Sequence, residues 1–156
     1  SLTLAADFQL SFWKQYQDLN IDFLSEKLQS FNQHILKDYK NSMTYHLGAQ
    51  WAATNRLDLR AGLMIDTAPM HQDCYNPETP GMTKIEPSVG LSFRPVKNFA
   101  IDFSMLYVAG LGRDNATCTY EDLLLKAAGS PNYVKEFTAD YKVNAVCPAI
   151  GVSLWF

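Results

Sequence analysis

Four polar side chains in the middle of the chain have the residue types and spacing of a small-molecule binding site. The positions of Asp58, Arg60 and Asp66 differ by even numbers, so the three side chains share one face of an extended segment. His46, in the preceding extended segment, is expected to face them. A guanidinium group can form charge-assisted hydrogen bonds, so a ligand site is one interpretation of these residues. The alternative is a polar surface without a ligand, in which these groups satisfy one another.

Motifs for catalysis, metals and cofactors are weak. His34, His46 and His71 lack the spacing of metal ligands, and Ser11 and Ser104 have no recognisable nucleophile context. The stretch "GLGRDN", residues 110–115, lacks the Lys-Ser/Thr ending of a phosphate-binding loop. We therefore predict no catalytic residues, no metal and no cofactor, and a protein that is not an enzyme.

Three cysteines, Cys74, Cys118 and Cys147, lie too far apart in the sequence for a zinc site. Cys74 and Cys118 both fall in connections that we expect at the outer end of the protein, where an oxidising environment permits a disulfide. A bridge between Cys118 and Cys147 is the competing pairing. The sequence leaves both pairings open.

Composition narrows the class of protein. The chain has 156 residues, of which 47% are hydrophobic, and its net charge is -3. This charge gives no basic footprint for nucleic acid and no polybasic patch for membrane surfaces. The mean hydropathy is -0.14 and no apolar run approaches 18 residues, which excludes a transmembrane helix. A transmembrane barrel stays possible, because alternation dilutes the average hydropathy.

Six segments alternate apolar with polar or small residues, which predicts antiparallel strands with two unlike faces. Most have nearly the length at which a tilted strand crosses a bilayer, about 9 to 11 residues. The six segments are residues 2–12, 44–52, 57–66, 88–94, 99–107 and 145–156.

The connections between these segments alternate in length. Two are short, around residues 54–56 and 95–98, whereas three are long. Short turns at one end and long loops at the other are typical of an outer-membrane β-barrel. A compact soluble domain seldom carries three such loops, since most connections have about 4 to 6 residues. The three long connections are residues 13–42, 67–86 and 108–141.

The first long connection also carries a helical pattern. Residues 24–39 place apolar side chains at helical spacing, with Ser25 as a candidate N-cap. We therefore expect a short helix in an outer loop, packed over the mouth of the barrel.

The last segment ends on an aromatic residue, Phe156. A final strand with a terminal aromatic residue resembles the signal that the outer-membrane assembly machinery reads on its barrel clients. The competing fold is a soluble β-sandwich binding domain. That alternative predicts that Leu59 and Leu63 lie in a sealed core.

The order of motifs resembles the C-terminal part of the long-chain fatty-acid transporter (FadL) family of outer-membrane proteins. "FWKQYQDL" at residues 12–19 is similar to that family's Trp, Tyr or Phe, and Leu pattern. "LDLRAGLMIDTAP" at 57–69 is similar to its Leu-Arg-x-Gly strand, which is followed by Asp and Ser-Pro. Further motifs in the same order are "KDYKNSMTYHLGAQW" at 37–51 and "EPSVGLSFRPVKNFAIDFSMLYV" at 86–108.

The resemblance implies an all-β fold, an antiparallel transmembrane β-barrel of roughly fourteen strands in the bacterial outer membrane. Residues 1–156 would be the C-terminal part of this one domain and supply its last six strands. The N-terminal half and the family's plug would lie outside this chain. Six strands are too few to close such a barrel, so we expect the first and last to need the missing half, or another chain, along their free edges.

The implied function is passive diffusion of hydrophobic compounds, such as long-chain fatty acids, through the barrel lumen. The implied partners are a hydrophobic small molecule or fatty acid and outer-membrane lipid. Arg60 and Asp66, carried over by motif, would line the lumen, together with Asp58 and His46. Arg60 would be the best candidate for contact with an acidic headgroup. His46 stands where members often show a lumenal Arg, and Met70 where they often repeat a proline, so a general hydrophobic cargo is favoured over fatty acid alone. The alternative is a binding or shuttle subunit of a surface-protein secretion assembly.

Overall fold

The computed structural model describes residues 1–77 and 81–156 and is all-β, with six long antiparallel strands in one sheet. The strand order is β1-β4-β5-β6-β7-β10, so neighbours in the sheet follow one another along the chain apart from the short hairpins between them. These strands are the six predicted segments, with ends that differ by a few residues. Their bounds are Leu2–Ser11 (β1), Ser42–Ala52 (β4), Leu57–Asp66 (β5), Lys84–Val96 (β6), Phe99–Gly110 (β7) and Asn144–Leu154 (β10).

The register of the sheet places most of the large apolar side chains on one face. Leu4 lies opposite Ala49, which lies opposite Ala61, while the next row aligns Ala5, Gly48 and Gly62. Successive side chains of a strand point to opposite faces, so one register serves both rows. We call the first surface the apolar face; it includes Leu2, Leu4, Phe8, Tyr45, Leu47, Leu59, Leu63, Val89, Phe103, Ile150 and Val152.

The apolar face is exposed along the sheet. Leu4 is 73% exposed and Ile150 is 77% exposed, and no second sheet of the described residues covers them. Leu59 and Leu63 belong to this face and are each 37% exposed. The soluble β-sandwich, which required these two leucines to lie in a sealed core, is therefore wrong.

We call the opposite surface the polar face. It carries charged and hydroxyl side chains, several of which are more buried than the leucines behind them: Asp58 is 3% exposed and Ser92 is 2% exposed. Its polar residues include Asp7, His46, Gln50, Asp58, Arg60, Asp66, Lys84, Glu86, Ser92, Arg94, Asp102 and Ser153.

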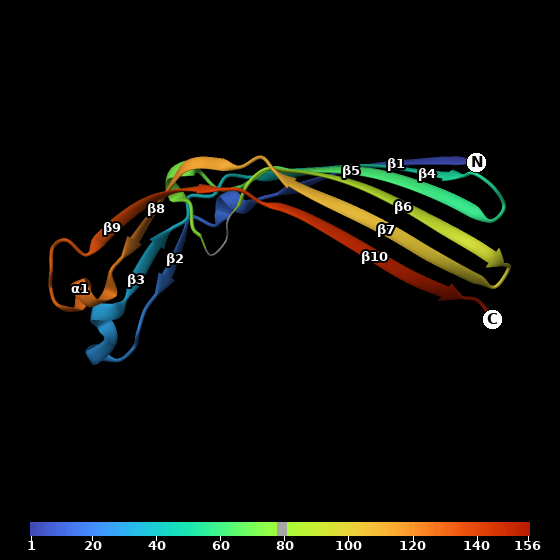
Figure 1. Ribbon diagram of the computed structural model, residues 1–156. Coiled ribbons are helices and arrows are strands. Elements are labelled where there is room, and N and C mark those ends of the chain that lie inside the picture. Colours follow the sequence, from blue (N-terminus) through green and yellow to red (C-terminus); the bar gives the residue numbers. More distant parts are fainter. Residues whose placement is uncertain (78–80) are drawn as a thin grey trace.

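The two ends of the sheet differ as the connection lengths predict. Figure 1 shows both termini and the tight turns at one end of the long strands, and the longer connections at the other. In one tight turn the Thr54 amide donates to the Leu57 carbonyl at 3.1 Å, and the Thr54 hydroxyl accepts from the Arg56 amide at 3.1 Å. A hydroxyl that bonds the backbone two residues later favours such turns.

The sequence suggested long loops between the main strands. Two of the three long connections instead carry strands of their own. Asp18–Ile21 (β2) pairs with Gln33–Leu36 (β3), and Arg113–Glu121 (β8) pairs with Val134–Tyr141 (β9). These outer hairpins extend beyond the end of the main sheet (Figure 1). Pairing satisfies the main-chain groups of a long excursion that would otherwise depend on water.

The predicted helix over residues 24–39 is confirmed over only part of that range and is wrong for the rest. A short 3-10 helix, Glu26–Phe31, is followed by β3, and the Ser25 side chain makes no capping hydrogen bond. A short isolated helix is marginal in water. Here the pairing of Leu36 with Asp18 and of Gln33 with Ile21 satisfies the same backbone as a strand. Pairing with β2 therefore overrides the helical spacing of the apolar residues.

An outer loop does carry a short α-helix, at Leu123–Ala127 (α1) rather than at the predicted place. The Asp122 side chain accepts from the amides of Leu124 and Leu125 at 3.1 and 3.2 Å, which caps the helix N-terminus. Gly129, with φ at +72°, then allows the chain to leave the helix in the left-handed conformation. No helix of the described residues has the length and apolar character to cross a membrane.

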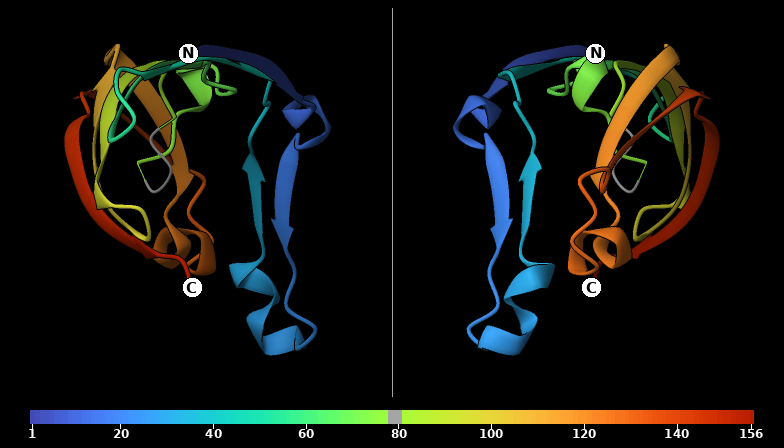
Figure 2. Two further views of the ribbon diagram at one scale, coloured as in Figure 1. Left: turned by 90° about the vertical axis from the view of Figure 1, so that its right-hand side faces the viewer. Right: turned by 90° about the vertical axis from the view of Figure 1, so that its left-hand side faces the viewer.

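The connection between β5 and β6 lies on the inner side of the arc that the strands form in Figure 2. We call its residues 68–77 and 81–82 the inward segment; it includes a 3-10 turn, Gln72–Cys74 (η3). Residues 78–80 of the predicted connection 67–86 lie outside the described residues. Most of the buried apolar residues gather here and in the adjoining hairpin; Tyr39 and Ala100 lie elsewhere. The gathered residues are Ala68, Met70, Tyr75 and Met82 of the inward segment and Ala116 and Cys118 of β8.

The polar face is the concave side of the sheet. Gly110 shares a face with Asp102, and a Cβ added at Gly110 would meet the Met82 sulfur of the inward segment. Since the inward segment lies within the arc in Figure 2, the face that it contacts is the inner one.

The main sheet is open, as expected for six strands. β1 and β10 stand at the two ends of the strand order, so each has one edge without a partner among the described residues. Such edges present unpaired amide and carbonyl groups that favour pairing with further strands.

We predict that Gly110→Ala destabilises the protein whereas Gly48→Ala does not. The Cβ of residue 110 would meet the Val143 carbonyl oxygen at 3.0 Å as well as Met82, but the Cβ of residue 48 would meet nothing within 4 Å. Overpacking against backbone costs about 1–3 kcal/mol. Thermal unfolding of the full-length protein, followed by circular dichroism, compares the two variants. Equal melting temperatures for the two would contradict the prediction.

Candidate functional site

The three charged residues of β5 share the polar face as predicted, but the structure gives each a different partner. Asp58 forms an ion pair with Arg94. Asp66 lies 3.4 Å from the Lys84 amine and accepts from the Thr44 hydroxyl at 3.0 Å. The side chains are thus spread along the strand and do not converge on one point.

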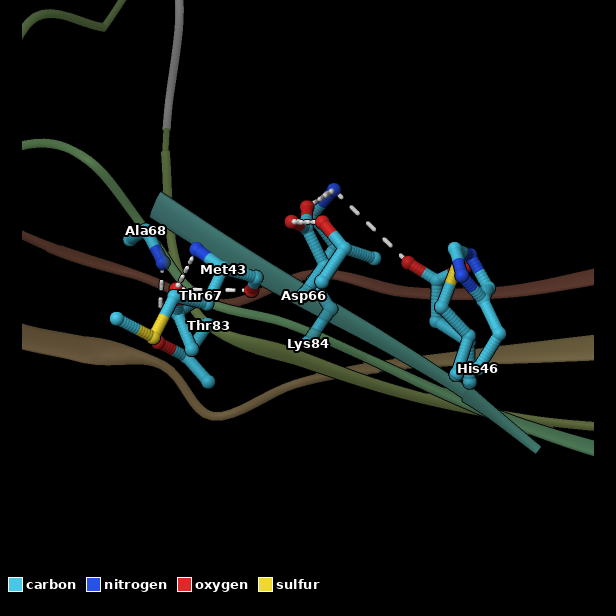
Figure 3. Close-up of polar contacts among 10 residues, drawn as sticks. Met43, His46, Asp66, Thr67, Ala68, Thr83 and Lys84 are labelled. Carbon is cyan, nitrogen blue, oxygen red and sulfur yellow. Dashed lines mark hydrogen bonds and ion pairs between the residues drawn. The ribbon is translucent and has the colours of Figure 1, made fainter. Parts of the chain in front are cut away.

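His46 lies on the polar face but is not a neighbour of Arg60 or Asp66. Its Nδ1 is 2.6 Å from the Asp7 carboxylate, and its Nε2 is 2.9 Å from the Met64 sulfur. Figure 3 shows His46 apart from the pair formed by Asp66 and Lys84. His46 therefore shares the polar face with the β5 charges, but its side chain contacts Asp7 and Met64 instead of them. The register explains why, since His46 lies opposite Met64.

Arg60 contacts two other side chains of the polar face. Its Nε donates to the Gln50 side-chain oxygen at 3.0 Å, and its guanidinium lies 3.7 Å from the Asp102 carboxylate. The side chain is 42% exposed, so the pair with Asp102 leaves N–H donors open to solvent. A partly exposed guanidinium with spare donors can accept a carboxylate or another polar headgroup.

A shallow hollow of about 410 Å³ surrounds Arg60. Its floor consists of glycines because Gly48, Gly62 and Gly90 occupy polar-face positions of three adjacent strands. Because glycine has no side chain beyond a hydrogen atom, these positions leave space that larger residues would fill. The other lining residues are Thr3, Ala5, Ala49, Gln50, Arg60, Ala61, Ser88, Val89 and Ser104.

A larger hollow, about 610 Å³, lies on the apolar face behind the first. Alkyl side chains such as Leu4, Leu47 and Leu63 line it, and no charged side chain does. It offers nothing to orient a polar group, so the hollow beside Arg60 is the better candidate for headgroup recognition despite its smaller volume.

Asp102 is a functional candidate that sequence reasoning missed. It accepts hydrogen bonds from Ser92 and from Ser153, the latter at 3.4 Å, in addition to its contact with Arg60. The signal was present in the sequence, because Asp102 alternates with the apolar residues of β7. Its partners lie in β6, β10 and β5, so only the register brings them together.

The outer rim of the polar face is bound across three strands. The Thr67 hydroxyl accepts from the Met43 amide at 2.7 Å and donates to the Met43 carbonyl at 3.0 Å, and the Ala68 amide donates to the Thr83 hydroxyl at 3.2 Å (Figure 3). These bonds join the start of the inward segment to β4 and β6. The inward segment is therefore positioned by hydrogen bonds at its base.

The cysteines occupy two regions. Cys74 of η3 is a free thiol, so the predicted disulfide with Cys118 is not formed in this structure. Burial raises the pKa of the Cys74 thiol, and the carboxylates of Asp38 and Asp73 raise it further. Cys147 is an exposed free thiol on β10, on the polar face opposite Leu106. Among the described residues, no group of histidine, cysteine, aspartate and glutamate could hold a metal ion.

An antiparallel sheet that curves around a polar concave face, and that exposes an apolar convex face, is the architecture of a membrane-barrel wall. A family model described as outer membrane protein transport protein (OMPP1/FadL/TodX) matches residues 1–156. The chain therefore belongs to this family of outer-membrane transport proteins.

A solved structure, the crystal structure of a Pseudomonas aeruginosa FadL homologue, is similar to this chain with a TM-score of 0.73 and 18% sequence identity. The match covers 98% of this chain and 32% of the other, so the chain spans about a third of the length of that relative. A comparison with curated protein sequences found no match.

We predict that Asp58→Asn lowers the free energy of unfolding by about 1–3 kcal/mol, because it leaves the half-buried Arg94 cation without its anionic partner. Urea unfolding of the full-length protein measures the change. Asp22→Asn, which removes an exposed carboxylate, is the control and should change stability by less than about 0.5 kcal/mol. A loss of the same size in both variants would contradict a specific role for the ion pair.

We also predict that Asp38→Asn speeds alkylation of Cys74 near pH 8. Only the thiolate reacts, and the raised pKa of Cys74 keeps that form scarce; removing one of the carboxylates that raise the pKa lowers it and increases the thiolate fraction. Asparagine also accepts the positive φ of residue 38, 45°. Mass spectrometry of reduced Cys118→Ser protein gives the rate, with Cys147 as internal control. An unchanged ratio of the two rates would show that Asp38 does not act on Cys74.

Proposed function

We propose that this chain forms part of a closed outer-membrane β-barrel, of roughly fourteen strands, through which hydrophobic compounds diffuse passively. The observation that carries the proposal is the opposition of the two faces. A convex face of exposed leucine, isoleucine and phenylalanine suits lipid tails, and a concave face of paired charges suits a hydrated lumen. Diffusion along this lumen requires no cofactor and no covalent step.

The open edges support the same reading. β1 and β10 would pair with strands of a preceding N-terminal half, which would complete the barrel and remove both edges. In this arrangement the end with the tight turns faces the periplasm and the outer hairpins face the exterior, because barrels of this class have short periplasmic turns and long extracellular loops.

Arg60 is the proposed contact for the polar head of the transported compound. It is partly exposed, retains unsatisfied donors and lies beside a glycine-floored hollow. Asp102 and Gln50 hold the guanidinium in place while the head binds. Asp58, Asp66 and His46 line the same face but are already paired, so their proposed role is to keep the lumen polar. Long-chain fatty acids are one class of compound that such a site fits.

A second candidate is a binding or shuttle subunit of a surface-protein secretion assembly. It is favoured by the apolar side chains at the tips of the outer hairpins, where Leu24 is 101% exposed and Leu124 is 79% exposed. Replacing both with serine would abolish surface display of a partner protein under this alternative and leave uptake of small molecules unchanged under the first.

We expect Arg60→Gln to reduce uptake of a long-chain carboxylate by about 3–10-fold, which corresponds to the loss of about 1 kcal/mol from a charge-assisted hydrogen bond at a partly exposed site. Uptake of the methyl ester of the same compound should not change, because the ester lacks the charge. Proteoliposomes that contain the full-length protein allow both rates to be measured.

Lys97→Gln is the matched control, because it removes one positive charge from the tight turn between β6 and β7 rather than from the polar face. Gel migration with and without boiling verifies that each variant is folded. Equal loss of carboxylate and ester uptake in Arg60→Gln would argue against headgroup recognition. No uptake of either compound by the wild-type protein would remove the transport proposal itself.

A further inference from the structure

The inward segment and the β8–β9 hairpin meet at a pair of cysteines. The Tyr75 amide donates to the Thr117 carbonyl at 3.0 Å. Cys74 directly precedes Tyr75, and Cys118 directly follows Thr117. One main-chain hydrogen bond thus connects the two residues adjacent to the cysteines, although 43 residues separate Cys74 from Cys118 in the sequence.

The hydrogen bond places the two cysteine backbones near each other. Only the Cys74 carbonyl carbon lies between the Cα atom of Cys74 and the donor nitrogen. On the other side, the Thr117 carbonyl carbon and the Cys118 nitrogen lie between the acceptor oxygen and the Cα atom of Cys118. A disulfide requires Cα atoms about 4.4–6.8 Å apart. The covalent geometry on both sides of the hydrogen bond limits the distance between the two Cα atoms to about 8 Å, so the two cysteine backbones lie within reach of this range.

Side-chain packing holds the inward segment at this position. The Tyr75 ring lies 4.4 Å from the Tyr141 ring of β9, and the Arg113 guanidinium lies 5.9 Å above Tyr75. Arg113 also donates to the Met70 carbonyl at 3.0 Å. Tyr75 is 2% exposed and Cys118 is 7% exposed, so the junction is shielded from solvent. The contact between the two segments is therefore a packed interface with several independent bonds.

The Tyr75 hydroxyl is a polar group of this junction whose hydrogen-bonding capacity is not satisfied. Its hydroxyl is buried and has no hydrogen-bond partner among the described residues. Burial raises the pKa of this hydroxyl despite the opposing effect of Arg113. A buried polar group without a partner costs stability, which a covalent link between the same two segments would offset.

Cys147 is excluded as the partner of Cys118. Cys147 lies opposite Leu106 within the main sheet, whereas Cys118 lies opposite Phe137 in the outer hairpin. The residues Leu111 and Gly112 separate β7 from β8, so Cys147 and Cys118 are on opposite sides of this junction along the barrel axis. The structure thereby decides between the two pairings that the sequence left open.

We propose that Cys74 and Cys118 form a disulfide that fastens the inward segment to the β8–β9 hairpin. This proposal rests on the outer-membrane location proposed above, because that location exposes the thiols to the disulfides of cell-envelope thiol oxidases. One cysteine attacks the oxidant's disulfide as a thiolate and forms a mixed disulfide. The other cysteine then displaces the oxidant's sulfur, so the two protein S–H bonds become one S–S bond and the oxidant leaves as a dithiol.

The raised pKa of Cys74 affects how the link forms and persists. A scarce thiolate at Cys74 slows its attack on an oxidant, and a sulfur of raised pKa leaves slowly when an external thiolate attacks the Cys118 sulfur of the completed bond. Once formed, the disulfide keeps the inward segment within the mouth of the barrel, above the polar face that carries Arg60. The device thus sets the position of the segment that a compound entering from the outer end meets first.

The test begins with full-length protein in isolated outer membranes, treated with N-ethylmaleimide before extraction and digested without reduction. We expect mass spectrometry to find the peptide containing Cys74 linked to the peptide containing Cys118, and Cys147 in the alkylated form. Alkylation of both Cys74 and Cys118, or a link from Cys118 to Cys147, would overturn the proposal.

A second measurement separates the geometry from the location. Purified, reduced protein is incubated with oxidised glutathione, and its melting temperature is followed. We expect the Cys74–Cys118 link to form and to raise the melting temperature by about 5–10 °C, and a reductant to reverse the rise. The Cys74→Ser variant should show no rise, whereas Cys147→Ser should behave as wild type.

The outcomes distinguish the two proposals. Formation of the link with glutathione but not in cells would contradict the proposed location, while failure with glutathione in folded protein would contradict the geometric argument alone. A rise of equal size in Cys74→Ser would also overturn the disulfide, because that variant cannot form it.

Discussion

The structure depends on one constraint: the main-chain amides and carbonyls between neighbouring long strands must pair, and the register that achieves this assigns each side chain to a face. In this sheet Leu4, Ala49 and Ala61 form one row and Ala5, Gly48 and Gly62 form the next. A slip by one residue would move the leucines to the concave side and the charges to the convex side. The opposition of the two faces and the register are therefore the same fact.

Charges on the concave face are stabilised in pairs rather than gathered into one site. Asp58 pairs with Arg94, Asp66 pairs with Lys84, and Asp7 pairs with His46. In each case the two residues belong to neighbouring strands. Such pairing lets a curved wall carry many charges without leaving any of them buried and alone. Arg60 differs because its partners leave part of the guanidinium exposed beside a floor of glycines. Arg60 is therefore more exposed than the paired cations Lys84 and Arg94 of the same face.

The outer end follows a different physical logic from the wall. Here the chain leaves the main sheet, and the buried residues Met70, Tyr75 and Met82 form a compact core against β8. Lys126 of α1 donates to the Asn32 carbonyl near the tip of the β2–β3 hairpin and lies 2.6 Å from Glu121. Packing and a few polar bonds, rather than a continuous ladder, hold these outer parts in place. Segments held in this way are the ones for which a covalent link has the greatest effect.

The sequence by itself determined the number of long strands, their two faces and the asymmetry of their connections, because alternation with a period of two is a local property of the chain. It also placed Asp58, Arg60 and Asp66 on a common face. It could not predict that residues 33–36 form a strand, since the helical spacing there is overridden by pairing with Asp18–Ile21.

Only the tertiary structure decided the partners. Asp102 joins Arg60, Ser92 and Ser153 because the register of four strands aligns them, and His46 faces Asp7 and Met64 rather than Arg60 for the same reason. Likewise, the proximity of Cys74 to Cys118 depends on how the inward segment folds back onto β8. Contacts between residues distant in sequence arise from pairing and packing, which leave no local pattern to detect, whereas the faces of a strand are present in its alternation.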